Sequence, residues 1–331
     1  MTRYENCSLK PYHTFGMEVK ARLVVEYDTV EELRSLLSEF RGQPILPVGQ
    51  GSNLLFTRDY EGVVLISRMR RARALGETKD DVLVEADGGL VLDELIAQLC
   101  DMGLCGLENL SGIPGTVGAS AVQNVGAYGV EAKDVIRSVR AVSIATGEER
   151  TFTPEECRYG YRDSVFKNEL RGQYIITAVT YRLKHGGPFA LDYGNLASAI
   201  QGEATVQKIR NAVLAIRAAK LPDVHVMGSA GSFFKNPVVT PAKFEEMHKL
   251  YPQMPYFPQE DGVKIPAAWL IDTLGWKGKM MGGAQVYEKQ PLVIVNTGSA
   301  VPDDIVRLAQ AVTDSVKEHF GIDISPEVNY I

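Results

Sequence analysis

Residues 111–129 read S-G-I-P-G-T-V-G-A-S-A-V-Q-N-V-G-A-Y-G, a stretch with five glycines and no charged side chain. Flexible linkers are also rich in glycine, but they stay solvated through Ser, Lys or Glu rather than through residues such as Ile113 and Val117. The backbone of this stretch is therefore predicted to be buried. Buried glycines in a loop indicate a main chain that adopts positive φ or passes close to another group. We expect a loop with a ligand or other backbone packed closely against it.

A second glycine-bearing segment, G-Q-G-S-N-L at residues 49–54, begins like the phosphate-binding fingerprint of a dinucleotide fold but lacks the third glycine. It also runs into L-L-F, a predicted strand, where that fingerprint needs the start of a helix. Alone, the segment is better explained as a tight turn. Together with residues 111–129 it indicates two loops whose bare amide groups can cradle a pyrophosphate. Side-chain donors are available at Ser52, Asn53, Thr116 and Ser120.

Length and composition narrow the class of protein. A chain of 331 residues is expected to form two or three lobes, and 45% hydrophobic with 23% charged residues is typical of a globular protein. The net charge of -6 argues against non-specific nucleic-acid binding, although a local cation cluster can still receive an anionic small ligand. No apolar run reaches the length of a membrane span, and the first residues lack the apolar core of a signal peptide. We expect a cytoplasmic protein without membrane insertion.

Several kinds of catalytic site are absent from the sequence. The cysteines have no C-x-x-C spacing and are predicted to be reduced and inert; they are Cys7, Cys100, Cys105 and Cys157. The five histidines are scattered, so no metal site is expected. The chain also lacks a Walker A lysine motif, H-E-x-x-H and G-x-S-x-G. Chemistry without these groups indicates a cofactor that carries the reaction.

The predicted secondary structure mixes helices and strands without a sustained βαβ rhythm, so the fold class is predicted to be α+β. Helices are predicted at residues 29–40, opened by a capping box of Thr29 and Glu32, and at 92–102, 206–220 and 302–320. Strands are predicted at residues 23–27, 45–48, 62–67, 82–86 and 174–183, with a hairpin turning at 146–147. The polar residues 201–205 predict a domain boundary near 205.

Three further segments carry side chains that suit catalysis: R-Y-G-Y-R-D-S-V-F-K at residues 158–167, G-S-A-G-S-F-F-K-N-P at 228–237, and S-P-E-V-N-Y-I at 325–331. Each also has a purely structural explanation. Arg162 can pair with Asp163, Ser232 can close a turn, and Glu327 can cap an edge strand. Taken one at a time, these segments do not establish a site.

In combination the segments are more specific. The loop at 49–56, the stretch at 111–129, G-Y-R-D-S-V-F-K, G-S-A-G-S-F-F-K-N-P and the terminal P-E-V-N-Y-I, in this order, closely resemble the UDP-N-acetylenolpyruvoylglucosamine reductases, the UDP-N-acetylmuramate dehydrogenases of bacterial wall synthesis. The resemblance extends from T-F-G-M at Thr14 to the last residue. The Y-G-N-L at residues 193–196 further resembles the form of the family whose inserted loop folds a tyrosine over the substrate.

This resemblance implies a domain arrangement and a set of ligands. Residues 1–205 would form a two-lobed FAD-binding fold of the vanillyl-alcohol-oxidase type, with lobes at roughly 1–67 and 68–205. Residues 206–331 would form an α+β substrate-binding domain whose C-terminal segment returns to the active site. FAD is the implied cofactor, NADPH the co-substrate and a nucleotide sugar the substrate. The implied FAD contacts are Gly49, Gly51, Ser52, Asn53, Gly112, Pro114, Gly115, Thr116, Gly118, Ser120, Gly126 and Arg217.

The resemblance also implies a reaction. NADPH reduces FAD and leaves, and a hydride then passes from flavin N5 to the terminal carbon of the enolpyruvyl ether of UDP-N-acetylglucosamine, giving UDP-N-acetylmuramate for peptidoglycan synthesis. The charge that develops on the other carbon and its carboxylate must meet preorganised donors. Arg162 would grip the carboxylate, Glu327 in its protonated form would donate to the developing enolate, and Ser232 would deliver the proton.

The implied substrate contacts are Tyr128, Tyr161, Tyr193, Lys220, Asn236 and Gln290. Without the resemblance, Lys220 is explained as a solvated lysine at a helix end. Two other functions stay open. A flavin oxidase of the same fold would use O₂, but oxidation needs a base where Ser232 offers a proton donor. A nucleotide-sugar binding or transfer protein without flavin would be colourless, so the colour of the purified protein distinguishes it.

Overall fold

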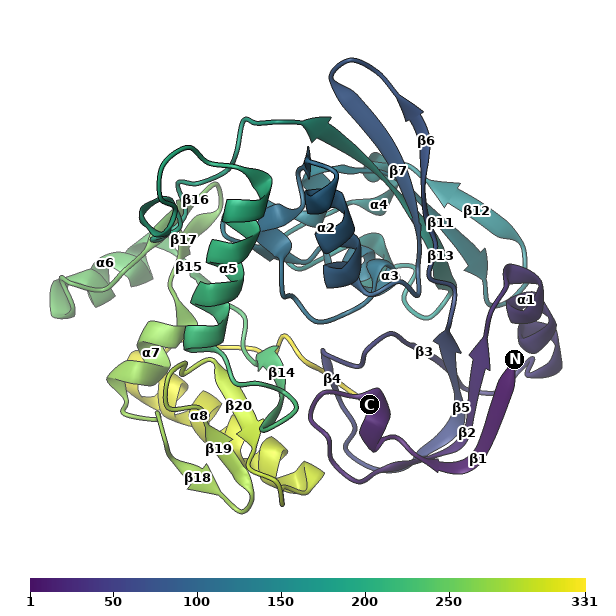
Figure 1. Ribbon diagram of the computed structural model, residues 1–331. Helices are drawn as coiled ribbons and strands as arrows, with labels where there is room; N and C mark the ends of the chain where they lie inside the picture. Colours follow the sequence, from purple (N-terminus) through teal and green to yellow (C-terminus); the bar gives the residue numbers. More distant parts are fainter. The chain divides into compact units, whose positions relative to one another are not determined.

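The computed structural model describes residues 1–331, and the contacts within the chain divide it into two interleaved units (Figure 1). The first unit contains residues 1–7, 21–50 and 61–219, and the second contains residues 8–20, 51–60 and 220–331. Two short N-terminal segments thus group with the C-terminal part of the chain. The division into domains 1–205 and 206–331 stays a prediction. The contacts within the chain place residues 206–219 in the first unit.

The N-terminal lobe of the first unit is a four-stranded sheet of order β1-β2-β5-β3, in which β3 and β5 are parallel. Its strands are β1 (Thr2–Ser8), β2 (Lys20–Tyr27), β3 (Ile45–Val48) and β5 (Tyr60–Ser67). Helix α1 (Val30–Glu39) carries Leu33, Leu36 and Leu37 into a core that includes Tyr27 and Val63. Their spacing of three and four residues places the leucines on one face of the helix.

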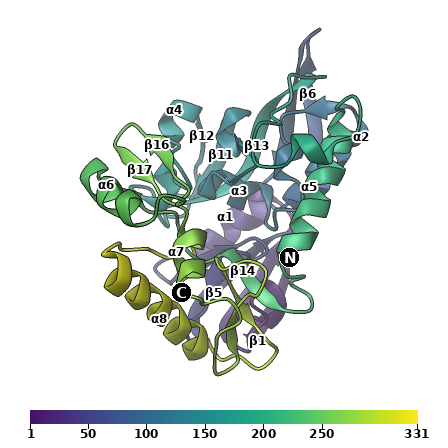
Figure 2. The ribbon, with the colours of Figure 1, turned by 90° about the vertical axis from the view of Figure 1, so that its left-hand side faces the viewer.

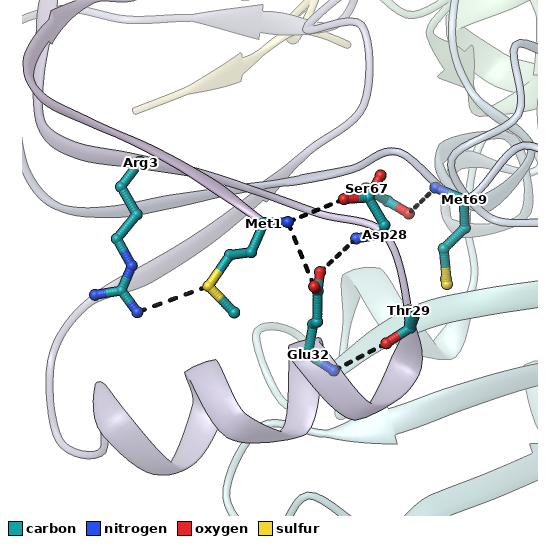
Figure 3. Close-up of polar contacts among 7 residues, drawn as sticks. All are labelled: Met1, Arg3, Asp28, Thr29, Glu32, Ser67 and Met69. Carbon is teal, nitrogen blue, oxygen red and sulfur yellow. Dashed lines mark hydrogen bonds and ion pairs between the residues drawn. The ribbon is translucent and has the colours of Figure 1, made fainter.

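The start of α1 is fixed by side-chain caps, shown in Figure 3. The Thr29 hydroxyl accepts a hydrogen bond from the amide of Glu32 at 3.1 Å, as the capping box predicts. The Glu32 carboxylate reaches one residue further back than predicted and accepts from the amide of Asp28 at 2.8 Å and from the ammonium group of Met1 at 3.3 Å. Loss of such a cap typically costs about 1 kcal/mol, so these contacts help to fix the first turn.

The second lobe of the first unit is built on a six-stranded antiparallel sheet of order β12-β11-β13-β7-β6, with β8 paired to the end of β13. Its strands are β6 (Ala72–Glu77), β7 (Asp81–Asp87), β8 (Leu104–Cys105), β11 (Ile136–Ser143), β12 (Glu149–Phe152) and β13 (Tyr174–His185). The β6–β7 hairpin projects from the sheet (Figure 1). Its helices are α2 (Leu92–Asp101), α3 (Val117–Gln123), α4 (Pro154–Cys157) and α5 (Val206–Lys220). Leu95 and Leu99 of α2 share one core with Val179 and Tyr181 of β13.

The second unit holds three small sheets, of orders β14-β20-β19-β18, β15-β17-β16 and β21-β4. The strands are β4 (Leu54–Leu55), β14 (Gly228–Ser232), β15 (Val238–Val239), β16 (Phe257–Gln259), β17 (Gly262–Lys264), β18 (Met280–Met281), β19 (Ala284–Val286), β20 (Val293–Asn296) and β21 (Asn329–Tyr330). Its helices are α6 (Pro241–Leu250), α7 (Ala267–Thr273) and α8 (Pro302–Phe320). Helix α8 lies along the first of these sheets (Figure 2) and packs Ile305, Leu308 and Val312 into the core.

The α+β fold class is confirmed, and the predicted helices at 29–40, 92–102, 206–220 and 302–320 all form. The expectation that residues 111–129 are a loop is wrong in part, because Val117–Gln123 is helix α3, with Thr116 as its N-cap. Small residues let this short helix pack directly on backbone. The Gly118 amide donates to the Gly88 carbonyl at 2.9 Å, and a Cβ at Gly118 would lie 3.1 Å from that oxygen. No helix has the length and apolar character needed to cross a membrane.

Candidate active site

The two glycine-rich segments meet through Gly49 and Gln50, which belong to the first unit together with residues 111–129, whereas residues 51–54 belong to the second unit. The side-chain oxygen of Gln50 accepts a hydrogen bond from the Gly115 amide at 2.6 Å. Gly49 lies so close to the stretch at 111–129 that a Cβ at Gly49 would sit 2.6 Å from the Thr116 hydroxyl oxygen. Real Cβ atoms do not approach other atoms so closely, so this position requires glycine. At this junction the Gln50 side chain and the Thr116 hydroxyl lie between the two backbone segments.

A cavity of about 110 Å³ lies at this junction, and Gly49, Gly88, Gly89, Thr116 and Gly118 contribute to its lining. The amides of Gly49, Gly89 and Thr116 donate to no acceptor within the chain. A backbone N–H without an acceptor can bind an anion, so these amides are candidate donors to a pyrophosphate, and apolar side chains such as Val48 and Ile176 line the same cavity. Complete ligand pockets usually measure roughly 300–1,000 Å³, so this cavity can receive only one part of a dinucleotide.

The start of the stretch at 111–129 is held by an ion pair that the sequence did not predict. Asp93 of α2 accepts two hydrogen bonds from Arg210 of α5, at 2.5 and 2.9 Å, and one from the Gly112 amide at 2.7 Å. Burial works to raise the pKa of Asp93, but the bonds from Arg210 and Gly112 outweigh it and hold that pKa below its usual value. Arg217 lies further along α5, where a Cβ on Gly112 would sit 3.2 Å from its Nε. Asp93 therefore fixes the helix that carries Arg217 against the loop.

Arg162 is held by backbone rather than by its sequence neighbour. Its Nη2 donates to the Gly126 carbonyl, its Nη1 lies 3.8 Å from a Glu131 carboxylate oxygen, and its guanidinium lies 5.1 Å from the Tyr161 ring centre. The alternative that Arg162 pairs with Asp163 is wrong, because the Asp163 carboxylate accepts from Asn168 at 3.0 Å instead. A Cβ on Gly126 would lie 2.8 Å from Arg162 Nη1, so a glycine there makes room for this side chain.

The three tyrosines expected at the substrate also belong to the first unit. Tyr128 and Tyr193 meet edge to face, with ring centres 6.4 Å apart and an interplanar angle of 89°. Tyr193 and Tyr161 are exposed, as ligand-facing aromatic side chains must be before a ligand binds. Ser120 is buried and its hydroxyl donates to the Val117 carbonyl at 2.7 Å, so its contact with a ligand stays a prediction.

In the second unit the C-terminal segment connects two predicted site regions. Glu327 donates its amide to the Phe233 carbonyl at 2.7 Å, next to Ser232, and its own carbonyl accepts from the Asn53 side chain at 3.2 Å. Strand β21 then pairs in parallel with β4, which follows Asn53 directly. Gly51 has a φ of +62°, and a Cβ there would lie 2.2 Å from the Tyr12 carbonyl oxygen. Ser232, Glu327 and Asn53 are thereby brought into one region of this unit.

The remaining substrate candidates of the second unit have structural contacts of their own. The Asn236 side chain accepts from the Ala267 amide at 2.9 Å, at the start of α7. Gln290 lies in the turn between β19 and β20, and its side chain accepts from the Leu292 amide at 3.4 Å. Lys220 is the last residue of α5 and is exposed. Ser52 and Pro114 are half-buried. The ligand contacts assigned to all of these residues stay predictions.

The cysteines offer no reactive thiol in the core. All four are free, and burial raises the pKa of Cys100 to about 12 and that of Cys157 to about 11. The thiolate is the nucleophilic form, so these groups are unreactive near neutral pH.

Sequence reasoning missed Gln50, Asp93 and Asn109, whose side chains bind the backbone of the glycine-rich stretch. Gln50 lies between the two glycines of a motif already selected, and this position could have indicated it. Asp93 and Asn109 have no such signal, because nothing in the sequence shows that they reach this backbone.

Comparison with known proteins identifies the family. Residues 222–331 match the model of the UDP-N-acetylenolpyruvoylglucosamine reductase C-terminal domain, and residues 21–153 match an FAD-binding domain. The reductase of Bacteroides fragilis is 47% identical over 98% of both chains. The chain belongs to the UDP-N-acetylenolpyruvoylglucosamine reductase family.

Further comparisons agree with this placement. The reductase of Pseudomonas aeruginosa is 43% identical, again over 98% of each chain. The crystal structure of UDP-N-acetylenolpyruvylglucosamine reductase from Thermus caldophilus covers 99% of this chain and 98% of its own, with a TM-score of 0.69 and 25% identity. The predicted family, the FAD-binding fold and the expectation of an FAD-dependent reductase are confirmed.

Proposed function

We propose that this enzyme uses NADPH to reduce the enolpyruvyl ether of UDP-N-acetylglucosamine to UDP-N-acetylmuramate in peptidoglycan precursor synthesis. The observation that carries the proposal is the junction of the two glycine-rich segments beside a cavity that Gly49 and Thr116 line, in a chain of the reductase family. NADPH and nucleotide sugars are cytoplasmic metabolites, so we place the enzyme in the cytoplasm. We keep residues 206–331 as the substrate-binding domain.

FAD fits the junction because its pyrophosphate can accept from the amides of Gly49 and Thr116, which donate to no acceptor within the chain. Gln50 holds the two segments together, and Asp93 holds the start of the stretch at 111–129. When bound, FAD supplies the hydride of the reaction. The remaining steps are assigned to side chains of this chain.

Arg162 receives the carboxylate of the enolpyruvyl group. A guanidinium carries five N–H donors in a planar fork, so it can grip a carboxylate while it also binds the Gly126 carbonyl. The side chain is only 18% exposed, and a partly desolvated cation stabilises developing negative charge more strongly than a solvated one. Its fixed position supports a role in the transition state.

Ser232 supplies the proton to the carbon that gains negative charge, and Glu327 contacts the developing enolate. The contact between the Glu327 amide and the Phe233 carbonyl supports this pairing, because it joins the two segments beside both side chains. The residues assigned to the nucleotide sugar are Tyr128, Tyr161, Tyr193, Lys220, Asn236 and Gln290.

The proposal is tested by anaerobic mixing of the purified yellow protein with NADPH or NADH. We expect FAD to be released on denaturation, and the bound flavin to be reduced faster by NADPH than by NADH. Reduction of the flavin by NADH but not by NADPH would show that the assignment of NADPH as co-substrate is wrong. A colourless protein that takes up no FAD on titration would instead support a nucleotide-sugar binding protein.

A further inference from the structure

One buried side chain connects two parts of the first unit that lie far apart in the sequence. Asn109, in the 3-10 helix η2 (Glu108–Leu110), is 1% exposed. Its Nδ2 donates to the carbonyl oxygen of Tyr128 and to that of Ala190, both at 2.8 Å. Its Oδ1 is buried and has no hydrogen-bond partner. Because an unsatisfied buried acceptor is costly, the side chain is retained for its two donors.

The first acceptor lies in a strained turn. Tyr128 and Gly129 connect β9 (Gly126–Ala127) to β10 (Val130–Glu131), and Ala127 pairs with Val130 across the turn. Both turn residues have positive φ, +48° at Tyr128 and +82° at Gly129, as a type I′ turn requires. A tyrosine seldom adopts this conformation without support. Asn109 provides support by binding the Tyr128 carbonyl.

The second acceptor lies in a segment with few other contacts. The bond from Asn109 to Ala190 is the only hydrogen bond that residues 187–192 make within the chain. Phe189 and Leu191 pack on a small cluster with Ile209 and Val213 of α5. Tyr193 follows three residues after Ala190, and its ring meets the Tyr128 ring. One amide group thus holds the backbone beside both rings.

We infer that Asn109 is a positioning residue, which latches the segment at 187–192 onto the Tyr128 turn and so fixes the backbone that carries the Tyr128 and Tyr193 rings. The inference rests on the proposed role of Tyr193 at the substrate. A preorganised pair of rings loses less conformational freedom on binding than a mobile pair. Loss of the latch therefore weakens substrate binding and leaves the flavin junction intact.

The test compares Asn109→Leu and Asn109→Asp with Cys105→Ala. Leucine keeps the volume without donors, and a neutral aspartic acid, the form that burial favours, keeps only one donor for the two carbonyls. The control loses the Cys105 thiol contact with the Gly186 carbonyl, just before the same segment, but keeps both bonds of Asn109. Substrate affinity is measured by perturbation of the flavin spectrum, beside FAD content and the rate of flavin reduction by NADPH. Asn109→Leu should bind substrate on the order of 10-fold more weakly, because binding must then order the segment, Asn109→Asp should bind more weakly by a smaller factor, and Cys105→Ala should bind like the wild type.

Tyr193→Ala separates this inference from the proposed function. If Tyr193→Ala binds substrate like the wild type, the role of Tyr193 is wrong. If Tyr193→Ala is weak and both Asn109 variants bind normally, the latch is wrong. The double variant Tyr193→Ala/Asn109→Leu should be little weaker than Tyr193→Ala, because Asn109 acts through that ring. If the losses of substrate affinity in the two single variants multiplied in the double variant, or if Cys105→Ala lost as much affinity as Asn109→Leu, the latch would be wrong. General loosening of the segment would then explain the result.

Discussion

The Gln50 side-chain oxygen and the Gly115 amide nitrogen lie 2.6 Å apart, and this hydrogen bond joins the two glycine-rich segments within the first unit. Gly49 meets Thr116 beside it, so the segments touch at two successive positions. Neither segment alone predicts a cofactor site, since residues 49–54 can be explained as a tight turn and residues 111–129 as a buried loop packed against other backbone. Their contact forms one cavity, which Gly49 and Thr116 both line.

Gln50→Ala should weaken FAD binding by about 5-fold to 10-fold, because one hydrogen bond is worth roughly 1 kcal/mol and the Gly115 amide would lose its acceptor. The measurement is titration of the apoprotein with FAD, followed by quenching of flavin fluorescence. Gln43→Ala is a suitable control, because Gln43 binds Arg22 in the same unit but lies outside the glycine-rich segments. Equal affinities for Gln50→Ala and the wild type would mean that the junction does not hold the cofactor.

Arg162→Lys should slow flavin reoxidation by the enolpyruvyl substrate by on the order of 100-fold, because lysine keeps the charge but lacks the planar fork. FAD content and reduction by NADPH should be unchanged. Arg158→Lys is the matched control in the same segment, since Arg158 is exposed and pairs with Glu169 at 2.6 Å on the surface. Normal reoxidation in Arg162→Lys would leave Arg162 with a structural role only.

Asp93→Asn should lower the free energy of unfolding at pH 7 by about 1–2 kcal/mol, because the hydrogen bonds from Arg210 and Gly112 would lose their charged acceptor. The pKa of Asp93 is lowered in the fold, so this stability is present above the unfolded value of about 3.9 and is lost as pH falls through the folded value.

Denaturant unfolding at pH 7 and near pH 3 checks this: the difference between the wild type and Asp93→Asn should shrink in acid. Glu39→Gln at the exposed pair with Arg3 should change the unfolding free energy by no more than about 0.5 kcal/mol. A difference that is the same at both pH values would show that the Asp93 charge is not involved.

The long helices could be predicted from sequence because local signals define them. Thr29 caps α1, Pro302 starts α8 and Gly321 follows its end at a φ of 65°. Helix α3 could not, since its small residues form no amphipathic face and its stability comes from packing on the Gly88 backbone. The grouping of residues 8–20 and 51–60 with the C-terminal part depends on contacts between distant segments, which periodicity does not reveal.

The candidate site shows the same division. Motif order indicated the family and the glycine-rich segments, but no pattern indicated that Asp93 binds Gly112 or that Asn109 binds Tyr128. Each of these bonds joins a side chain to a backbone group, and any polar residue of suitable reach could make it. The partner of Arg162 was likewise open, because Asp163 is adjacent in sequence whereas Gly126 and Glu131 approach only in the fold.

Ser232→Ala should retain FAD, fold and the NADPH half-reaction, because it removes one oxygen atom, yet it should reoxidise with substrate at least 100-fold more slowly. General acid catalysis typically contributes about 10² to 10⁴-fold to the rate, and no histidine is among the predicted catalytic residues. Ser232→Cys should keep part of the rate, since a thiol also gives up a proton. Single-turnover stopped-flow measures both variants, and reoxidation of Ser232→Ala within about 10-fold of the wild type would assign the proton to water or another group.

The most direct measurement is anaerobic reoxidation of the wild-type enzyme after its flavin has been reduced with dithionite rather than NADPH. The reduced enzyme is mixed with the enolpyruvyl ether of UDP-N-acetylglucosamine, flavin absorbance is followed, and the products are separated. We predict that the absorbance of oxidised flavin returns and that UDP-N-acetylmuramate forms in an amount equal to the flavin. A flavin that stays reduced until oxygen is admitted, with the sugar recovered unchanged, would contradict the assignment of this reaction.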